Sequence, residues 1–143
     1  MYLLDTNVVS ELRKGNKADR HVAAWAGEVD IAVMYLSVIS VLEIRLGILS
    51  VRRKDETQAN RLDAWLEEQV FPHFADRVLP VDIPVALRCA ALHVPDPRSD
   101  RDALIAATAL VHGLTVVTRN IKDFQATDVS LLNPWMIKNG DVS

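Results

Sequence analysis

Four acidic residues stand where carboxylates could gather around a metal ion: Asp5, Glu43, Asp102 and Asp123. Asp5 and Asp123 each follow a short apolar run, whereas Glu43 and Asp102 lie within otherwise apolar stretches of helical character. A carboxylate is costly to bury among apolar neighbours unless it has a partner. These positions therefore require hydrogen bonds, an ion pair or a bound cation.

Each acid also has an ordinary structural explanation. Asp5 can cap the following helix and still leave one carboxylate oxygen free. Asp102 can be a first-turn acid favoured by the helix dipole, and Asp123 can be a turn residue. Glu43 can form a salt bridge, although Arg45, two positions further on, points to a different face of the helix. No single acid identifies a site.

Together, the four carboxylates have a more specific chemistry. At about 4 Å and an effective dielectric constant near 20, one pair of like charges costs roughly 4 kcal/mol. A hard divalent cation removes this cost, and oxygen ligands suit Mg²⁺ or Mn²⁺. The histidines are scattered along the chain and Cys89 is the only cysteine, so a zinc site is not expected. The sequence predicts a Mg²⁺ or Mn²⁺ site.

Short strands alternating with helices must position these acids. We expect strands at residues 2–4, 31–36, 78–81, 114–118 and 129–132, and helices at 6–12, 19–28, 37–50, 54–74, from 82 onward and from 99 or 100 to 113. Helix 37–50 is apolar nearly all round and is expected to be buried. This order predicts an α/β fold with a mostly parallel sheet, in which ligands bind beyond the carboxyl ends of the strands.

Composition indicates one globular domain, which we expect over residues 1–135, and we expect a polar and flexible tail at 136–143. The chain has 143 residues, 50% of them hydrophobic, and a net charge of −3. This argues against disorder and against a protein that coats nucleic acid by bulk charge. Residues 31–49 could span a bilayer in length, but Glu43 and Arg45 make that costly. With no signal peptide and a single cysteine, we expect a soluble, cytoplasmic protein that does not enter membranes.

Four motifs occur in order: Leu3-Leu4-Asp5-Thr6-Asn7, Ser37-Val38-Ile39-Ser40-Val41-Leu42-Glu43, Asp102-Ala103-Leu104-Ile105-Ala106-Ala107-Thr108-Ala109 and Thr118-Arg119-Asn120-Ile121-Lys122-Asp123-Phe124. With the ending Asn133-Pro134-Trp135, the sequence resembles the PIN-domain family, and within it the VapC-type toxins of type II toxin–antitoxin pairs. The resemblance covers residues 1–135.

This resemblance implies a PIN-like α/β/α sandwich and an endoribonuclease that uses Mg²⁺ or Mn²⁺ to hydrolyse RNA phosphodiesters, leaving 5′-phosphate and 3′-hydroxyl ends. The four acids would be catalytic residues and metal ligands. Thr6, Thr118 and Asn120 would support them by hydrogen bonds or through water. Implied partners are a small antitoxin, through which alone the protein would meet DNA, and a second copy in a homodimer, with higher assembly in the antitoxin complex.

Basic residues near the motifs could hold the RNA backbone. Candidates are Arg13 and Lys14 after the first helix, Arg53 after the Glu43 helix, and Arg119 and Lys122 in the fourth motif. Phosphate contacts of this kind position a nucleic acid without reading its sequence. The alternative for each is solvated surface charge.

Three other functions fit parts of the pattern. A phosphatase that forms an aspartyl-phosphate needs a second aspartate two residues after Asp5, where Asn7 stands. A receiver domain needs paired acids near the first strand and a late lysine, whereas two of these acids lie on helices. A regulatory partner of a DNA-binding antitoxin, with little or no nuclease role, stays open.

Overall fold

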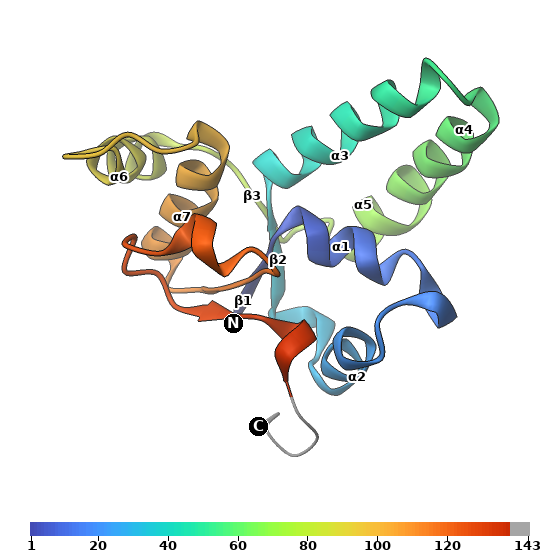
Figure 1. Cartoon of the computed structure of the whole chain (residues 1–143), viewed down its shortest axis with the longest axis horizontal. Helices are drawn as coiled ribbons and strands as arrows, with labels where there is room; N and C mark the ends of the chain where they lie inside the picture. Colours follow the sequence, from blue (N-terminus) through green and yellow to red (C-terminus); the bar gives the residue numbers. More distant parts are fainter. Residues whose placement is uncertain (138–143) are drawn as a thin grey trace.

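A five-stranded sheet forms the centre of the protein, in a computed structural model that describes residues 1–137. The strands lie in the order β3-β2-β1-β4-β5, and every neighbouring pair is parallel (Figure 1). Their bounds are Tyr2–Leu4 (β1), Met34–Ser37 (β2), Val78–Leu79 (β3), Thr115–Val117 (β4) and Leu131–Leu132 (β5). The predicted α/β class with a parallel sheet is confirmed.

Helices cover both faces of this sheet (Figure 1). On one face α7 packs against the strands and α6 stacks outside it; α1 to α4 lie on the other face. The bounds are Thr6–Leu12 (α1), Arg20–Glu28 (α2), Val38–Arg52 (α3), Glu56–Trp65 (α4), Phe71–His73 (α5), Ile83–Leu92 (α6) and Asp100–His112 (α7). Short 3₁₀ helices span Gly15–Lys17, Ile31–Val33, Ile121–Phe124 and Pro134–Met136, and a π-helix spans Leu66–Val70.

The strands are apolar on both sides because both faces of the sheet are covered. Leu3 and Val116 pack with α7, while the next residues, Leu4 and Val117, pack into the cluster under α1 to α4. This alternation follows from the two-residue period of a strand.

Most element boundaries differ from the sequence prediction by one or two residues, and two differences are larger. The strand expected at 31–36 begins only at Met34, because the Asp30 carboxylate accepts a hydrogen bond from the Ala32 N–H and caps a 3₁₀ turn there. The single helix expected at 54–74 is divided into α4, the π-helix and α5.

The prediction that the Glu43 helix is buried all round is wrong. One side of α3 packs into the core through Ile44 and Ile48. Leu42, Leu46 and Leu49 are 45%, 47% and 51% exposed on its other side. Their spacing of four and three residues places them on one helix face. We call these three residues the leucine stripe.

Of the predicted tail at 136–143, only the first two residues are described. Met136 ends a 3₁₀ helix, and Ile137 packs against the core cluster of the α1 face. The remaining six positions lie outside the described residues. Within residues 1–137, the helices are too short or too polar to cross a membrane.

Candidate functional site

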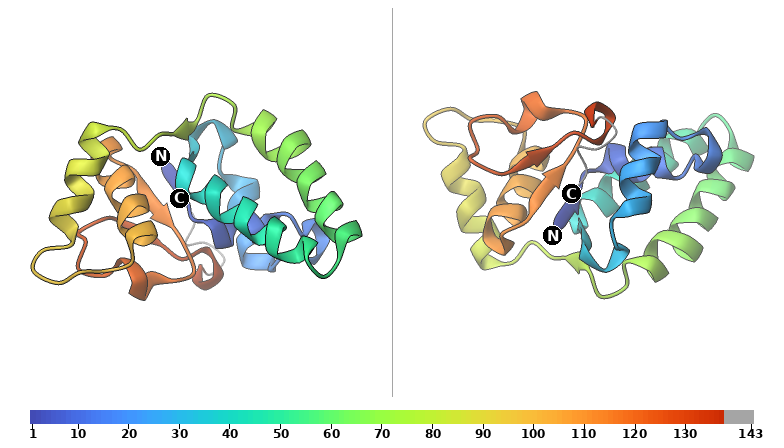
Figure 2. Two further views of the ribbon diagram at one scale, coloured as in Figure 1. Left: turned by 90° about the horizontal axis from the view of Figure 1, so that it is seen from above. Right: turned by 90° about the horizontal axis from the view of Figure 1, so that it is seen from below.

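The carboxyl ends of β1, β2 and β4 lie at one edge of the sheet, and α1 and α3 begin directly after β1 and β2. The first turn of α7 reaches the same edge (Figures 1 and 2). Because successive short strands end there, the residues that follow them are brought together from distant parts of the chain. Three of the predicted acids sit at these helix starts.

Asp5 is the N-cap of α1 and is 7% exposed. Its Oδ1 accepts a hydrogen bond from the Thr6 N–H at 2.8 Å. Its Oδ2 accepts from the Thr118 hydroxyl at 2.8 Å and from Asn7 Nδ2 at 3.3 Å. The N-cap bond uses only Oδ1, and Oδ2 has two hydrogen-bond donors of its own. A carboxylate has about four lone-pair sites, so acceptor capacity remains for another ligand.

Asn7 connects the first and fourth motifs, a role that the sequence did not suggest. Its amide Nδ2 lies 3.3 Å from the Thr118 hydroxyl oxygen, and its Oδ1 accepts from the Arg119 N–H at 3.3 Å. Thr118 is fully buried and also accepts from the Asn120 N–H at 3.0 Å. Asn120 is thus linked to this site through its backbone N–H. For Asn7, the only signal in the sequence was its position two residues after Asp5.

Glu43 lies in the second turn of α3 and points toward α1 and α7. Its Oε1 accepts a hydrogen bond from the Thr6 hydroxyl at 2.8 Å. Its Oε2 lies 3.7 Å from Nη1 of Arg101, which sequence reasoning had missed. Arg45 pairs instead with Asp63 on α4, which confirms that it faces away from Glu43.

Asp102 lies in the first turn of α7, and its N–H donates to the Ser99 N-cap hydroxyl at 3.5 Å. Burial raises the pKa of the Asp102 carboxyl, and the negative charges of Asp123, Asp5 and Glu43 raise it further. Asp102 therefore lies within electrostatic reach of the other three acids.

Burial likewise raises the pKa of Asp5. The hydrogen bonds from Thr118 and Thr6 oppose this rise, while the charges of Glu43 and Asp123 add to it. Because mutual repulsion disfavours the charged forms, a cation among these carboxylates would stabilise them.

The donor set fits Mg²⁺ or Mn²⁺ without forming a closed cage. Within residues 1–137, no three Asp, Glu, His or Cys side chains lie close enough together to hold one ion as they stand. Mg²⁺ usually binds through one or two carboxylates and keeps several waters. The charged forms of Asp5 and Asp102 are disfavoured by burial and by neighbouring negative charges, so both carboxylates would be stabilised by such an ion.

Two of the predicted RNA-binding residues lie beside the site. Arg119 follows Thr118 at the end of β4, and Lys122 is exposed in the 3₁₀ helix that also carries Asp123. The Arg119 guanidinium lies over the Trp135 ring, 5.2 Å from its centroid. The Arg119 side chain is therefore held against the 3₁₀ helix Pro134–Met136.

The other three predicted RNA-binding residues lie at the far ends of their helices. Arg13 and Lys14 follow α1, and Arg53 follows α3. At about 1.5 Å of rise per residue, roughly 12–15 Å of helix separates them from the acids. Lys14 is ion-paired with Glu11 at 2.8 Å. Any contact they make with RNA would lie away from the carboxylates.

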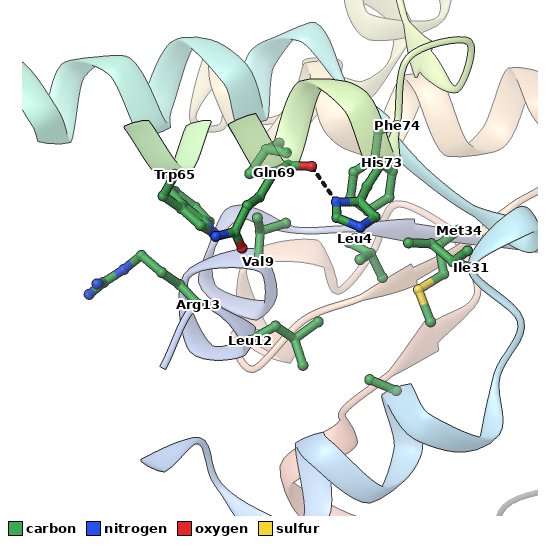
Figure 3. A pocket seen from close by; sticks show the side chains of 12 residues that line it. Leu4, Val9, Leu12, Arg13, Ile31, Met34, Trp65, Gln69, His73 and Phe74 are labelled. Carbon is green, nitrogen blue, oxygen red and sulfur yellow. Dashed lines mark hydrogen bonds between the residues drawn. The ribbon is translucent and has the colours of Figure 1, made fainter. Parts of the chain in front are cut away.

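A separate cavity of about 250 Å³ opens between α1, α2, the start of β2 and the π-helix (Figure 3). Its lining is mainly apolar, and Arg13, Trp65, Gln69 and His73 contribute polar groups. Trp65 thus faces a cavity, whereas Trp25 is buried in the core. This cavity is not lined by the four acids.

Comparison with known proteins identifies the family. The PIN domain model matches residues 2–129. Toxin FitB of Neisseria gonorrhoeae is 41% identical over 143 positions, covering 94% of this chain and 99% of FitB. VapC ribonuclease Y4jK of Sinorhizobium fredii is 40% identical, with 94% and 98% covered. A solved structure of FitAB bound to an IR36 DNA fragment contains a chain of 36% identity and TM-score 0.86, with 98% of this chain and 99% of that chain covered. The chain belongs to the PIN domain family, in the group that contains FitB and the VapC toxins.

Proposed function

We propose that this chain is an endoribonuclease dependent on Mg²⁺ or Mn²⁺ and acts as the toxin of a toxin–antitoxin pair in the cytoplasm. The observation that carries the proposal is the hydrogen-bonded set at the edge of the sheet where α1, α3 and α7 begin: Thr6 links the carboxylates of Asp5 and Glu43, and Asp102 lies in the first turn of α7. Names of relatives support the same role, since one is called a toxin and another a VapC ribonuclease.

Hydrogen bonds hold two of the carboxylates in fixed directions. Thr118 and Asn7 orient Asp5, and the Thr6 hydroxyl orients Glu43. A bound divalent cation would supply a water of lowered pKa and would stabilise charge on the attacked phosphate. Asp5, Glu43, Asp102 and Asp123 would hold that cation, and in-line hydrolysis would leave 5′-phosphate and 3′-hydroxyl ends.

The direct test is cleavage of RNA by the purified chain. We expect cleavage with Mg²⁺ or Mn²⁺, none with EDTA, and none from Asp102→Asn in either metal. Circular dichroism of the variant should match that of the parent, so that loss of cleavage reports on the site. Full activity in EDTA, or in Asp102→Asn, would remove the metal mechanism.

The expected protein partners are a small antitoxin and a second copy of this chain. The apolar cavity beside Trp65 offers a contact for an apolar antitoxin segment. The leucine stripe on α3 is the surface on which we expect the homodimer to form. Expression of the chain alone should be toxic, and co-expression of its antitoxin should restore growth.

A second function is favoured by one comparison. A solved relative of 36% identity is described as FitAB bound to a DNA fragment. This chain could therefore serve mainly as the partner of a DNA-binding antitoxin and shape its affinity for DNA. If Asp102→Asn still tightens promoter binding by the antitoxin while RNA cleavage is absent from the wild type, the regulatory role is the main one.

A further inference from the structure

Arg101 is a basic residue that forms an ion pair with Glu43, one of the acids of the candidate site. It lies in the first turn of α7, next to Asp102, and its Nη1 atom is 3.7 Å from Glu43 Oε2. Half of its side chain is exposed to solvent, whereas the Glu43 side chain is 25% exposed. The ion pair therefore bridges α7 and α3 across the mouth of the site.

The contact with Glu43 leaves Arg101 largely uncommitted. Within residues 1–137, its guanidinium makes no hydrogen bond, and a guanidinium has five N–H donors. Five other arginines are held by partners of their own: Arg45 and Arg52 by Asp63, Arg77 and Arg98 by backbone carbonyls, and Arg119 by the Trp135 ring. Arg101 thus combines proximity to the carboxylates with free donors.

The negative charge of the site suggests a ligand for the free N–H donors of Arg101. Four neighbouring carboxylates repel a phosphate, and a divalent cation offsets only part of their negative charge. Guanidinium groups bind phosphate oxygens through two parallel N–H donors, a geometry that lysine lacks. An arginine beside the carboxylates can therefore attract the RNA phosphate without taking the place of the metal ligands.

We propose that Arg101 binds a non-bridging oxygen of the RNA phosphate at the cleavage site and positions that phosphate against the carboxylates. This inference rests on the proposed ribonuclease function. A cation bound by Glu43 would offset the negative charge of this carboxylate and so weaken its ion pair with Arg101. The N–H donors of the guanidinium would then be available to the phosphate.

The experiment compares wild type, Arg101→Gln and Arg101→Lys on a labelled single-stranded RNA that the wild type cleaves. Arg61→Gln is the matched control, because Arg61 is exposed on α4 and the change in net charge is the same. RNA affinity is measured in an Asp5→Asn background at several KCl concentrations. Mn²⁺ affinity is measured separately, by titration of the RNA-free proteins.

We expect Arg101→Gln to weaken RNA binding about tenfold and to lower the slope of log K against log[KCl] by about 0.7–1, as for one lost phosphate contact. Arg101→Lys should restore the slope but only part of the affinity. Arg61→Gln should match the wild type. Mn²⁺ should bind Arg101→Gln at least as tightly as wild type, because a competing cation beside Glu43 is gone.

Other results would show that Arg101 is only a structural partner of Glu43 and does not bind RNA. A salt slope of Arg101→Gln equal to that of Arg61→Gln, together with weaker Mn²⁺ binding, would overturn the inference while leaving the ribonuclease proposal standing. If the wild type cleaves no RNA in Mg²⁺ or Mn²⁺, the proposed function fails and this inference fails with it.

Discussion

The hydroxyl of Thr118 donates a 2.8 Å hydrogen bond to Oδ2 of Asp5, across 113 positions of sequence. Both residues directly follow strands that are neighbours in the sheet, β4 and β1. Since both side chains are buried, water cannot replace this bond. The direction of the Asp5 carboxylate therefore depends on a residue from the opposite end of the chain.

Thr118→Val should reduce both cleavage and stability. The valine keeps the side-chain shape but leaves Oδ2 of Asp5 without its closest donor. Loss of a hydrogen bond to a charged group costs about 1.5–3 kcal/mol, and loss of a residue that orients a metal ligand typically costs 10–100-fold in activity or metal affinity, as an order of magnitude. Chemical denaturation and RNA cleavage rates measure the two effects.

Thr108→Val is the control for this substitution. Thr108 is equally buried, but its hydroxyl donates to the Leu104 carbonyl within α7. We expect a small change in stability and unchanged cleavage. If Thr108→Val loses as much activity as Thr118→Val, the effect comes from core packing and not from Asp5.

Asp102→Asn should stabilise the metal-free protein at neutral pH. The folded-state pKa of Asp102 is raised above its ordinary value of 3.8, so the native state holds its proton more tightly than the unfolded state. Stability from this group therefore increases as pH falls from above the raised pKa toward about 4. The variant should melt a few degrees higher than wild type, about 1–3 °C at pH 7–8. The difference should vanish near pH 4 in EDTA, and a constant difference across this range would contradict the assignment.

Glu43→Gln should separate metal binding from structure. The Thr6 hydroxyl can still donate to the carbonyl oxygen of the substituted amide, and the lost pair with Arg101 is a partly exposed one worth about 0–1 kcal/mol. Apo stability should stay near that of the wild type. At Mn²⁺ concentrations near 100 times Kd, wild type should gain about 2.7 kcal/mol, and the variant should lose most of this gain.

The control for that comparison is Glu28→Gln, an exposed acid at the end of α2. It should retain the full Mn²⁺ shift in a thermal melt. Strong destabilisation of apo Glu43→Gln with an intact metal shift would mark Glu43 as a structural residue.

Leu46→Glu should prevent self-association. Leu46 is the central member of the leucine stripe and is 47% exposed, so a charge there is tolerated by the isolated chain. Sedimentation velocity should show a dimer for wild type and a monomer for the variant. Ala24→Glu, which adds the same charge to the exposed side of α2, should stay dimeric. A monomeric wild type at all concentrations would end the homodimer proposal.

Strand and helix periodicity predicted most of the architecture because the elements are short and well capped. Ser99 and Gly113 mark the ends of α7 as expected, with Gly113 in the left-handed conformation at φ 68°. The prediction from periodicity was wrong where a local contact changed the backbone, as at Asp30, whose cap delays the start of β2 to Met34. It also failed to predict which side of α3 would be exposed, because burial depends on neighbours such as α7 that the helix pattern does not specify.

The candidate acids could be chosen from sequence because each lies at a recognisable strand end or on an apolar helix. Their supporting contacts could not be chosen in the same way. Asn7 and Arg101 are ordinary polar residues in sequence, and their roles arise only when α1, α3 and α7 begin at the same edge. Conversely, Arg53 was a candidate RNA-binding residue because it follows the Glu43 helix, but it lies at the opposite end of α3 from the helix start where the acids lie.

The sheet order has a consequence for the timing of assembly. β1 is synthesised first but lies between β2 and β4 in the sheet. Its neighbour β4, Thr115–Val117, is synthesised more than 100 residues later. Until then Asp5 lacks Thr118, and Asp123 has not been incorporated. Domains generally fold as units during synthesis, and in this one the hydrogen bond from Thr118 to Asp5 cannot form until β4 has emerged. If the chain cleaves RNA as we propose, this order would keep the nascent protein inactive while it is still attached to the message that encodes it.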